Sequence, residues 1–83
     1  MKSFEPFDDE LEICASGKNI HLRSKTPIPC CWIKVSDPTG KIVFKKIEKE
    51  LTDTTISLKV KDGFYHVTLV TDKRFSTIMV FLE

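Results

Sequence analysis

The residues best suited to chemistry are two histidines and three cysteines, and they are scattered along the chain. His21 and His66 each sit in a strand-like alternation, with no carboxylate or nucleophile at a recognisable spacing. Cys14, Cys30 and Cys31 show neither a C-x-x-C spacing nor the Cys/His spacing of a zinc site. We therefore expect no catalytic residue, no metal site and no bound cofactor, so the chain is predicted not to be an enzyme.

The odd number of cysteines means that they cannot all pair within one chain. Three free thiols are favoured, because cysteine is also a common small residue of protein interiors. The alternative is one disulfide bridge from Cys14 to Cys30 or Cys31.

Charged clusters offer little more. The run Asp8-Asp9-Glu10 lacks the spaced ligands and the glycine of a calcium loop. Lys41, Lys45 and Lys46 lie near Phe44, a combination found on small nucleic-acid-binding barrels. The net charge of only +1 argues against a nucleic-acid partner. No apolar run approaches the roughly 20 residues of a membrane span.

Short β-strands must position these side chains. A chain of 83 residues makes one domain, and we expect an acidic N-terminal arm over residues 1–9 and a single domain over residues 10–83. Alternation of apolar and polar residues predicts seven strands, near residues 10–15, 19–24, 30–36, 41–47, 54–60, 64–71 and 75–82. Residues 25–29 are expected to be a connector, since two prolines do not fit a central strand, and residues 48–53 a polar link.

Turn signals recur about every 8–12 residues, a spacing typical of antiparallel sandwiches. The sequence therefore predicts an all-β fold, an antiparallel seven-stranded immunoglobulin/fibronectin-like β-sandwich. The alternative is a small five-stranded β-barrel.

The clearest turn is Asp37-Pro38-Thr39-Gly40. Asp37 suits the first position of a type I turn, and Pro38 pre-sets the backbone angle of the second. Gly40 can take the left-handed conformation that a bulged hairpin needs, so we predict a positive φ there.

Strand phase then divides the apolar residues between two faces. The predicted core is Ile33, Val35, Val43, Ile56, Leu58, Tyr65, Val67 and Leu69. Trp32, Phe44, Phe64 and Val70 are left on an outer face, and we predict that they form an interaction face. Its candidate occupants are the chain's own arm around Phe4–Phe7, a second copy in a homodimer, or a foreign protein partner.

The hairpin also resembles a known family. An alternating apolar strand leads to Asp37, two residues, Gly40, Lys41 and a second apolar strand, and a Gly-x-Tyr-x-Val pattern follows at residues 63–67. Over about residues 30–83 this resembles the C-terminal sorting domains of the Por (type nine) secretion system and related small secreted β-sandwich domains of unknown function. The resemblance implies a secreted or cell-envelope location and no catalytic residue.

We therefore expect a non-catalytic, secreted or envelope-associated β-sandwich module that acts in protein interaction. One alternative is a C-terminal sorting or anchoring domain of a larger secreted protein. Against it, Val60-Lys61-Asp62 replaces the family's usual Leu-Pro or Leu-Ser stretch, and we expect the chain to be complete, without a cargo enzyme in front. A second alternative is a small nucleic-acid-binding β-barrel. No leader peptide is visible after Met1, which leaves two alternatives open: a cytoplasmic location, or a leader that has been removed from this chain.

Overall fold

The computed structural model describes residues 5–6, 11–72 and 75–83, the first pair as backbone only. Every element in these residues is a β-strand, and all pairs are antiparallel. The strands are β1 (Glu5–Pro6), β2 (Leu11–Ser16), β3 (Asn19–Ser36), β4 (Ile42–Ser57), β5 (Gly63–Val70) and β6 (Phe75–Leu82). None of the described residues belongs to a helix long and apolar enough to cross a membrane.

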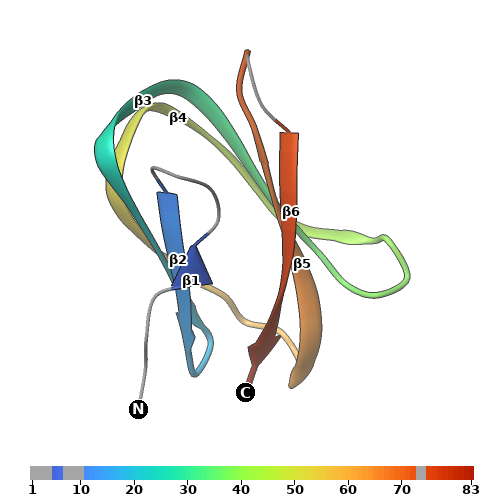
Figure 1. Cartoon of the computed structure of the whole chain (residues 1–83). Helices are drawn as coiled ribbons and strands as arrows, with labels where there is room; N and C mark the ends of the chain where they lie inside the picture. Colours follow the sequence, from blue (N-terminus) through green and yellow to red (C-terminus); the bar gives the residue numbers. More distant parts are fainter. Residues whose placement is uncertain (1–4, 7–10, 73–74) are drawn as a thin grey trace.

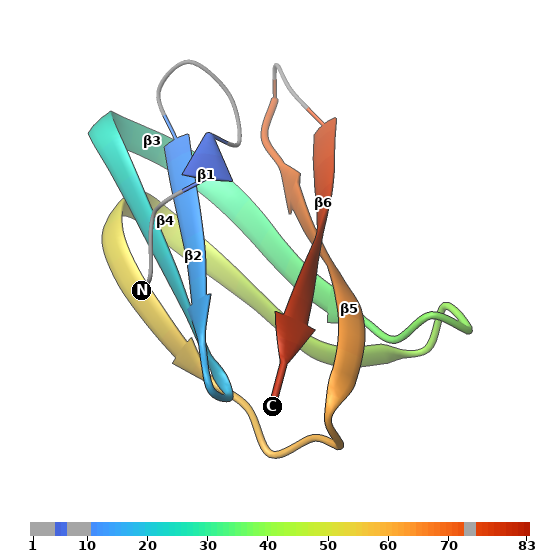
Figure 2. The same cartoon turned by 60° about the horizontal axis from the view of Figure 1, so that its bottom comes forward.

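The strands form one sheet that folds over on itself. Its order is β1-β2-β3-β5-β6, and β4 pairs with β3. Figure 1 shows β3 and β4 running side by side as a long ribbon that arches from one side of the molecule to the other, and Figure 2 shows the same ribbon behind β2 and β6.

The bent ribbon contributes to two layers. In the first layer, the amino-terminal part of β3 pairs with β2 and with the end of β4. In the second layer, the carboxyl-terminal part of β3 pairs with the start of β4 and with β5, which pairs with β6. Within the described residues β1 and β6 do not pair with each other, so the sheet stays open and the five-stranded barrel alternative is not supported.

The all-β antiparallel expectation is confirmed, but the expected number of strands is wrong. The predicted strands 19–24 and 30–36 are one strand, β3, and those near 41–47 and 54–60 merge into β4. The described residues therefore hold five strands of six or more residues and a two-residue β1 rather than seven strands.

The expected connector at residues 25–29 is the bend of β3. The register with β4 shifts between Arg23 and Ile28, and Pro27 lies in that interval. Cys30, just beyond, has a φ of 51°, which is unusual for a residue with a side chain. A missing proline N–H is tolerated where the ladder is interrupted, so the prolines mark a bend within the strand and not its end.

The expected polar link at residues 48–53 also lies inside a strand. β4 pairs only with β3 among the described strands, so its other side is an edge that faces solvent. Charged residues suit an edge strand because they discourage pairing with other chains. The polar composition therefore reflects an edge position and not a loop.

The turn at Asp37–Gly40 is as predicted. Gly40 N donates to Asp37 O at 2.9 Å, and Gly40 has a φ of 94°. The Asp37 Oδ1 atom accepts hydrogen bonds from Thr39 N at 3.0 Å, Thr39 Oγ1 at 2.6 Å and Lys41 N at 3.0 Å. These bonds hold the pKa of the Asp37 carboxyl below its ordinary value, with the Thr39 hydroxyl as the largest cause.

The core lies between the two layers, and seven of the eight predicted core residues are buried there: Ile33, Val35, Ile56, Leu58, Tyr65, Val67 and Leu69. The first layer adds Leu11, Ile13, Ile20 and Leu22. The Tyr65 hydroxyl is satisfied because it donates to Lys61 O at 2.7 Å.

The eighth predicted core residue, Val43, is only half-buried. Val35 pairs with Phe44 and Ser36 pairs with Ile42, so Val43 is the extra residue of a β-bulge. The bulge changes the phase of β4, and Phe44 rather than Val43 shares the inward face with Val35.

Candidate interaction surface

The register of the second layer places its outward side chains in cross-strand rows. Trp32 pairs with Ile47 on one side and with Val70 on the other, and Val70 pairs in turn with Phe75. Directly opposed residues in antiparallel strands point to the same face of a sheet. We call the side of this layer that points away from the core the outer face.

All the large hydrophobic side chains that are exposed among the described residues lie on the outer face. They are Trp32, Ile42, Ile47, Phe64, Phe75, Met79 and Phe81. Their exposed fractions run from 44% for Trp32 to 71% for Phe75. With about 150–250 Å² per large side chain, they expose roughly 700 Å² in total. This is a large exposed apolar area for one face of a small domain.

Three of the four predicted interaction residues lie on this face. Trp32 and Phe64 are exposed, and Val70 is half-buried between Trp32 and Phe75. The fourth, Phe44, does not, and that part of the prediction is wrong. Phe44 is paired with Val35 and packs partly buried against the core, because of the bulge at Val43.

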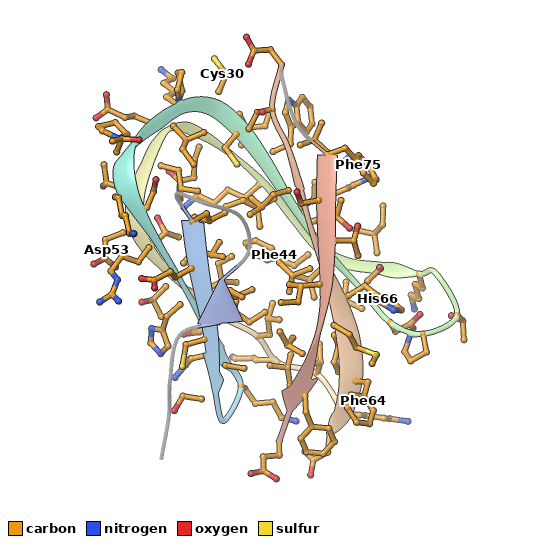
Figure 3. The ribbon with its side chains drawn as sticks, in the orientation of Figure 1. Cys30, Phe44, Asp53, Phe64, His66 and Phe75 are labelled. Atoms are coloured by element: carbon orange, nitrogen blue, oxygen red, sulfur yellow. The ribbon has the colours of Figure 1, made fainter. Side chains whose placement is uncertain are left out.

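Figure 3 shows this difference, with Phe64 and Phe75 along the side of β5 and β6 and Phe44 toward the middle of the molecule. Sequence reasoning missed the contribution of β6. That strand is apolar on both faces, which was a signal that its outward residues add to the patch. In the structure, Phe64 and Phe81 stack edge to face with ring centroids 5.0 Å apart.

A polar row divides the apolar residues of the outer face. Lys34 pairs with Lys45 on one side and with Thr68 on the other, and Thr68 pairs with Thr77. The Thr68 and Thr77 hydroxyls lie 3.1 Å apart and share a hydrogen bond, which explains how the buried Thr68 is satisfied. At the β4 end of the row lies a hollow of about 330 Å³, lined by Trp32, Lys34, Ile42, Lys45 and Val70.

The side chains suited to catalysis or metal binding do not come together in one site. His21 Nδ1 lies 2.9 Å from Thr55 Oγ1, within hydrogen-bond distance. Cys14 is the cross-strand neighbour of His21, but its Sγ lies 3.8 Å from Ala15 O. His66 lies on the outer face, two positions from Phe64. Within the described part of the chain, no group of three histidine, cysteine, aspartate or glutamate residues could hold a metal ion.

The three cysteines are free, as the sequence favours, and differ in their surroundings. Cys30 is exposed at the bend of β3, whereas Cys14 and Cys31 are buried. Burial raises the pKa of the Cys31 thiol from 9.0 to about 11, with a further contribution from the nearby Glu48 carboxylate. A thiol with a raised pKa is a poor nucleophile at neutral pH.

The basic cluster near Phe44 does not form one surface either. Lys45 faces outward with Lys34, whereas Lys46 pairs with Ile33 in the opposite phase. Lys46 Nζ is bound to Glu48 Oε1 at 2.9 Å. The combination of aromatic and basic residues in the sequence is therefore split between two faces.

Comparison with known proteins adds the fold class. No protein-family model matches the chain, and no curated protein matches it. The structure is similar to the crystal structure of a DUF3244-family protein with an immunoglobulin-like β-sandwich fold from Bacteroides vulgatus. The TM-score is 0.81 at 16% sequence identity, over 99% of this chain and 96% of the other.

The chain has an immunoglobulin-like β-sandwich fold. At 16% identity the likeness shows the fold alone. It agrees with the sandwich expected from the sequence. It brings no support for the sorting domain of the Por secretion system, which stays a prediction. In this immunoglobulin-like sandwich the outer face is the solvent side of the layer that holds β5 and β6.

Proposed function

We propose that this chain is a non-catalytic protein-interaction module, and that the outer face is its contact surface. The observation that carries the proposal is the segregation of exposed hydrophobics. Every one of them in the described residues lies on one face of one layer. Exposed hydrophobic side chains that gather on one face of a small domain typically mark an interaction site.

The size of the face fits a protein partner. A standard protein–protein interface buries about 800 Å² on each partner, close to the roughly 700 Å² of exposed hydrophobic residues on the outer face. Aromatic residues and methionine are also enriched in interfaces. Trp32, Phe64, Phe75, Met79 and Phe81 supply both kinds.

Site-specific photo-crosslinking in the cells that make the protein tests the proposal. A photoreactive phenylalanine is placed at Phe75 or Ile47 on the outer face, or at the exposed Asp53 as a control. Asp53 belongs to the first layer, and Figure 3 shows it on the opposite side of the molecule from Phe75. We expect one discrete product of the same mass from both outer-face positions and none from Asp53. No product, or equal products from all three positions, contradicts the proposal.

For the location of the protein, we propose the cell envelope or the extracellular space. The support is the resemblance of residues 30–83 to small secreted β-sandwich domains. The three free thiols favour a cytoplasmic location instead, because unpaired cysteines are more usual in reducing compartments. Fractionation of the native cells tests this part: recovery of the protein only with cytoplasmic markers contradicts it.

A further inference from the structure

The partner's chemistry can be inferred from the charges on the outer face. Among the outward residues in the cross-strand rows from Trp32 to Ser36, Lys34 and Lys45 are basic, and no carboxylate is present. The outward residues of β5 and β6 are Phe64, His66, Thr68, Val70, Phe75, Thr77, Met79 and Phe81. The face is therefore apolar with a positive centre.

The two lysines form an uncompensated pair. They are direct cross-strand partners, and like charges in that position repel and destabilise a sheet. No salt bridge in the described part of the chain involves either of them, whereas their neighbour Lys46 is bound to Glu48. A carboxylate placed between the two ammonium groups would remove this repulsion.

The pair lies beside apolar walls. The hollow of about 330 Å³ is lined by both lysines and by Trp32, Ile42 and Val70. It offers an apolar side chain a place against the indole ring and a carboxylate two basic partners.

From this geometry we infer that the hollow binds an extended segment of another protein that carries a carboxylate next to a large apolar side chain. The inference rests on the proposed function and names the chemistry of its partner. A nucleic-acid strand fits less well, because it needs a continuous track of phosphate contacts and here two lysines stand between apolar rows. The chain's own acidic arm fits less well too, because its described backbone, Glu5–Pro6, pairs with β2 in the first layer.

Trp32 is the only tryptophan of the chain, and it lines the hollow, so its fluorescence reports binding directly. The intact protein is titrated with capped octapeptides that alternate glutamate with leucine or phenylalanine. We expect a saturable change in Trp32 emission that weakens as salt is added. The same peptides with glutamine in place of glutamate should bind at least about tenfold more weakly.

Matched lysine variants locate the site. Lys34→Gln and Lys45→Gln should each weaken binding of the glutamate peptides by about tenfold or more. Lys46→Gln changes the same residue type on the same strand but in the opposite phase, and it should leave binding unchanged. All three substitutions are at surface positions, so circular dichroism should show an intact fold.

Several results would overturn the inference. They are equal binding of the glutamate and glutamine peptides, an equal loss of peptide affinity in Lys46→Gln and Lys34→Gln, and no binding of any octapeptide.

Other results would assign the hollow to a different occupant. Binding of oligothymidylate at least as tightly as the glutamate peptides would assign the lysines to nucleic acid instead. A dimer in sedimentation that Lys34→Gln dissociates would assign the hollow to a second copy. Stronger peptide binding after deletion of residues 1–9 would assign it to the chain's own arm.

The two proposals fail in different ways. If the outer-face positions crosslink to a partner but no acidic peptide binds, the contact surface stands and the inferred chemistry is wrong. If neither occurs, both are wrong.

Discussion

At the scale of single residues, the Asp37 carboxylate organises the hairpin tip. Its Oδ1 atom accepts three hydrogen bonds from Thr39 and Lys41, and these lower its pKa. A carboxyl group with a lowered native pKa stabilises the fold above its unfolded pKa, which is near 3.8. That contribution is lost as the pH falls through the lower native pKa.

We therefore predict that the stability of the protein falls on acidification below about pH 4, and that part of this loss disappears in Asp37→Asn. The variant should be less stable than the parent at neutral pH. Urea unfolding from about pH 2 to pH 6 measures both effects. An unchanged acid dependence in Asp37→Asn would contradict the role of this carboxyl.

For the Cys31 thiol we predict the opposite pH dependence, a loss of stability as the pH rises. Its native pKa of about 11 lies above the ordinary 9.0, so the unfolded chain loses the proton first as the pH rises. Stability should therefore fall between about pH 9 and pH 11, by at most about 3 kcal/mol for two pKa units. Cys31→Ala should be less stable at pH 7 but should lose less of its stability over that interval. Chemical unfolding at both pH values checks this.

The difference in exposure among the three cysteines predicts which thiol reacts with an external reagent. Cys30 is exposed, and Cys14 and Cys31 are buried. In a titration with Ellman's reagent, one thiol should react rapidly in the native protein and the others only on unfolding. Cys30→Ser should abolish the rapid phase, whereas rapid reaction that survives this substitution would place another cysteine at the surface.

At the scale of elements, alternation divides β5 between the two faces. Val67 is fully buried, whereas Val70 on the same strand points to the outer face and is half-buried. Val67→Ala should cost about 1–3 kcal/mol through lost burial and a cavity, and Val70→Ala should cost clearly less. If Val67→Ala and Val70→Ala lowered the free energy of unfolding equally, the assignment of Val67 to the core face and Val70 to the outer face would be wrong.

The cross-strand pair of Lys34 and Lys45 also leads to a prediction about stability, which does not depend on whether a partner binds. Because Lys34 and Lys45 repel each other, Lys34→Gln should raise the free energy of unfolding by a few tenths of a kcal/mol, up to about 1 kcal/mol. Added salt should reduce the difference between the two proteins, since screening weakens the repulsion. A loss of stability in Lys34→Gln would contradict an uncompensated pair.

Alternation and turn chemistry predicted the all-β class, the Asp37–Gly40 turn and most of the core. They could not predict the long ribbon, because the prolines at 27 and 29 and the charges of residues 48–53 read as strand ends. Prolines are also accepted at a bend, and charges at an exposed edge, and only the tertiary fold distinguishes these cases. The bulge at Val43 was also not predictable from alternation. It places Phe44 on the inward face, because a one-residue shift exchanges the two faces of a strand.

At the scale of the whole molecule, the buried and the exposed hydrophobic residues lie on different sides of the layers. The inner sides of both layers supply one core. The solvent side of the second layer carries the exposed hydrophobics and the lysine pair. The outward placement of Trp32, Phe64 and Val70 was predicted from the sequence, whereas the extent of the outer face over β6 depends on how β5 and β6 pair.

The exposure of Trp32 tests the outer face most directly. In a dilute solution of the monomer, acrylamide should quench Trp32 readily and its emission should lie at long wavelength, because its side chain points away from the core. The double variant Trp32→Phe, Phe44→Trp moves the reporter to the inward position and should give shielded, shorter-wavelength emission. Shielded emission from Trp32 in the monomer, with readily quenched emission from the double variant, would mean that the two faces are exchanged and that the proposed contact surface does not exist.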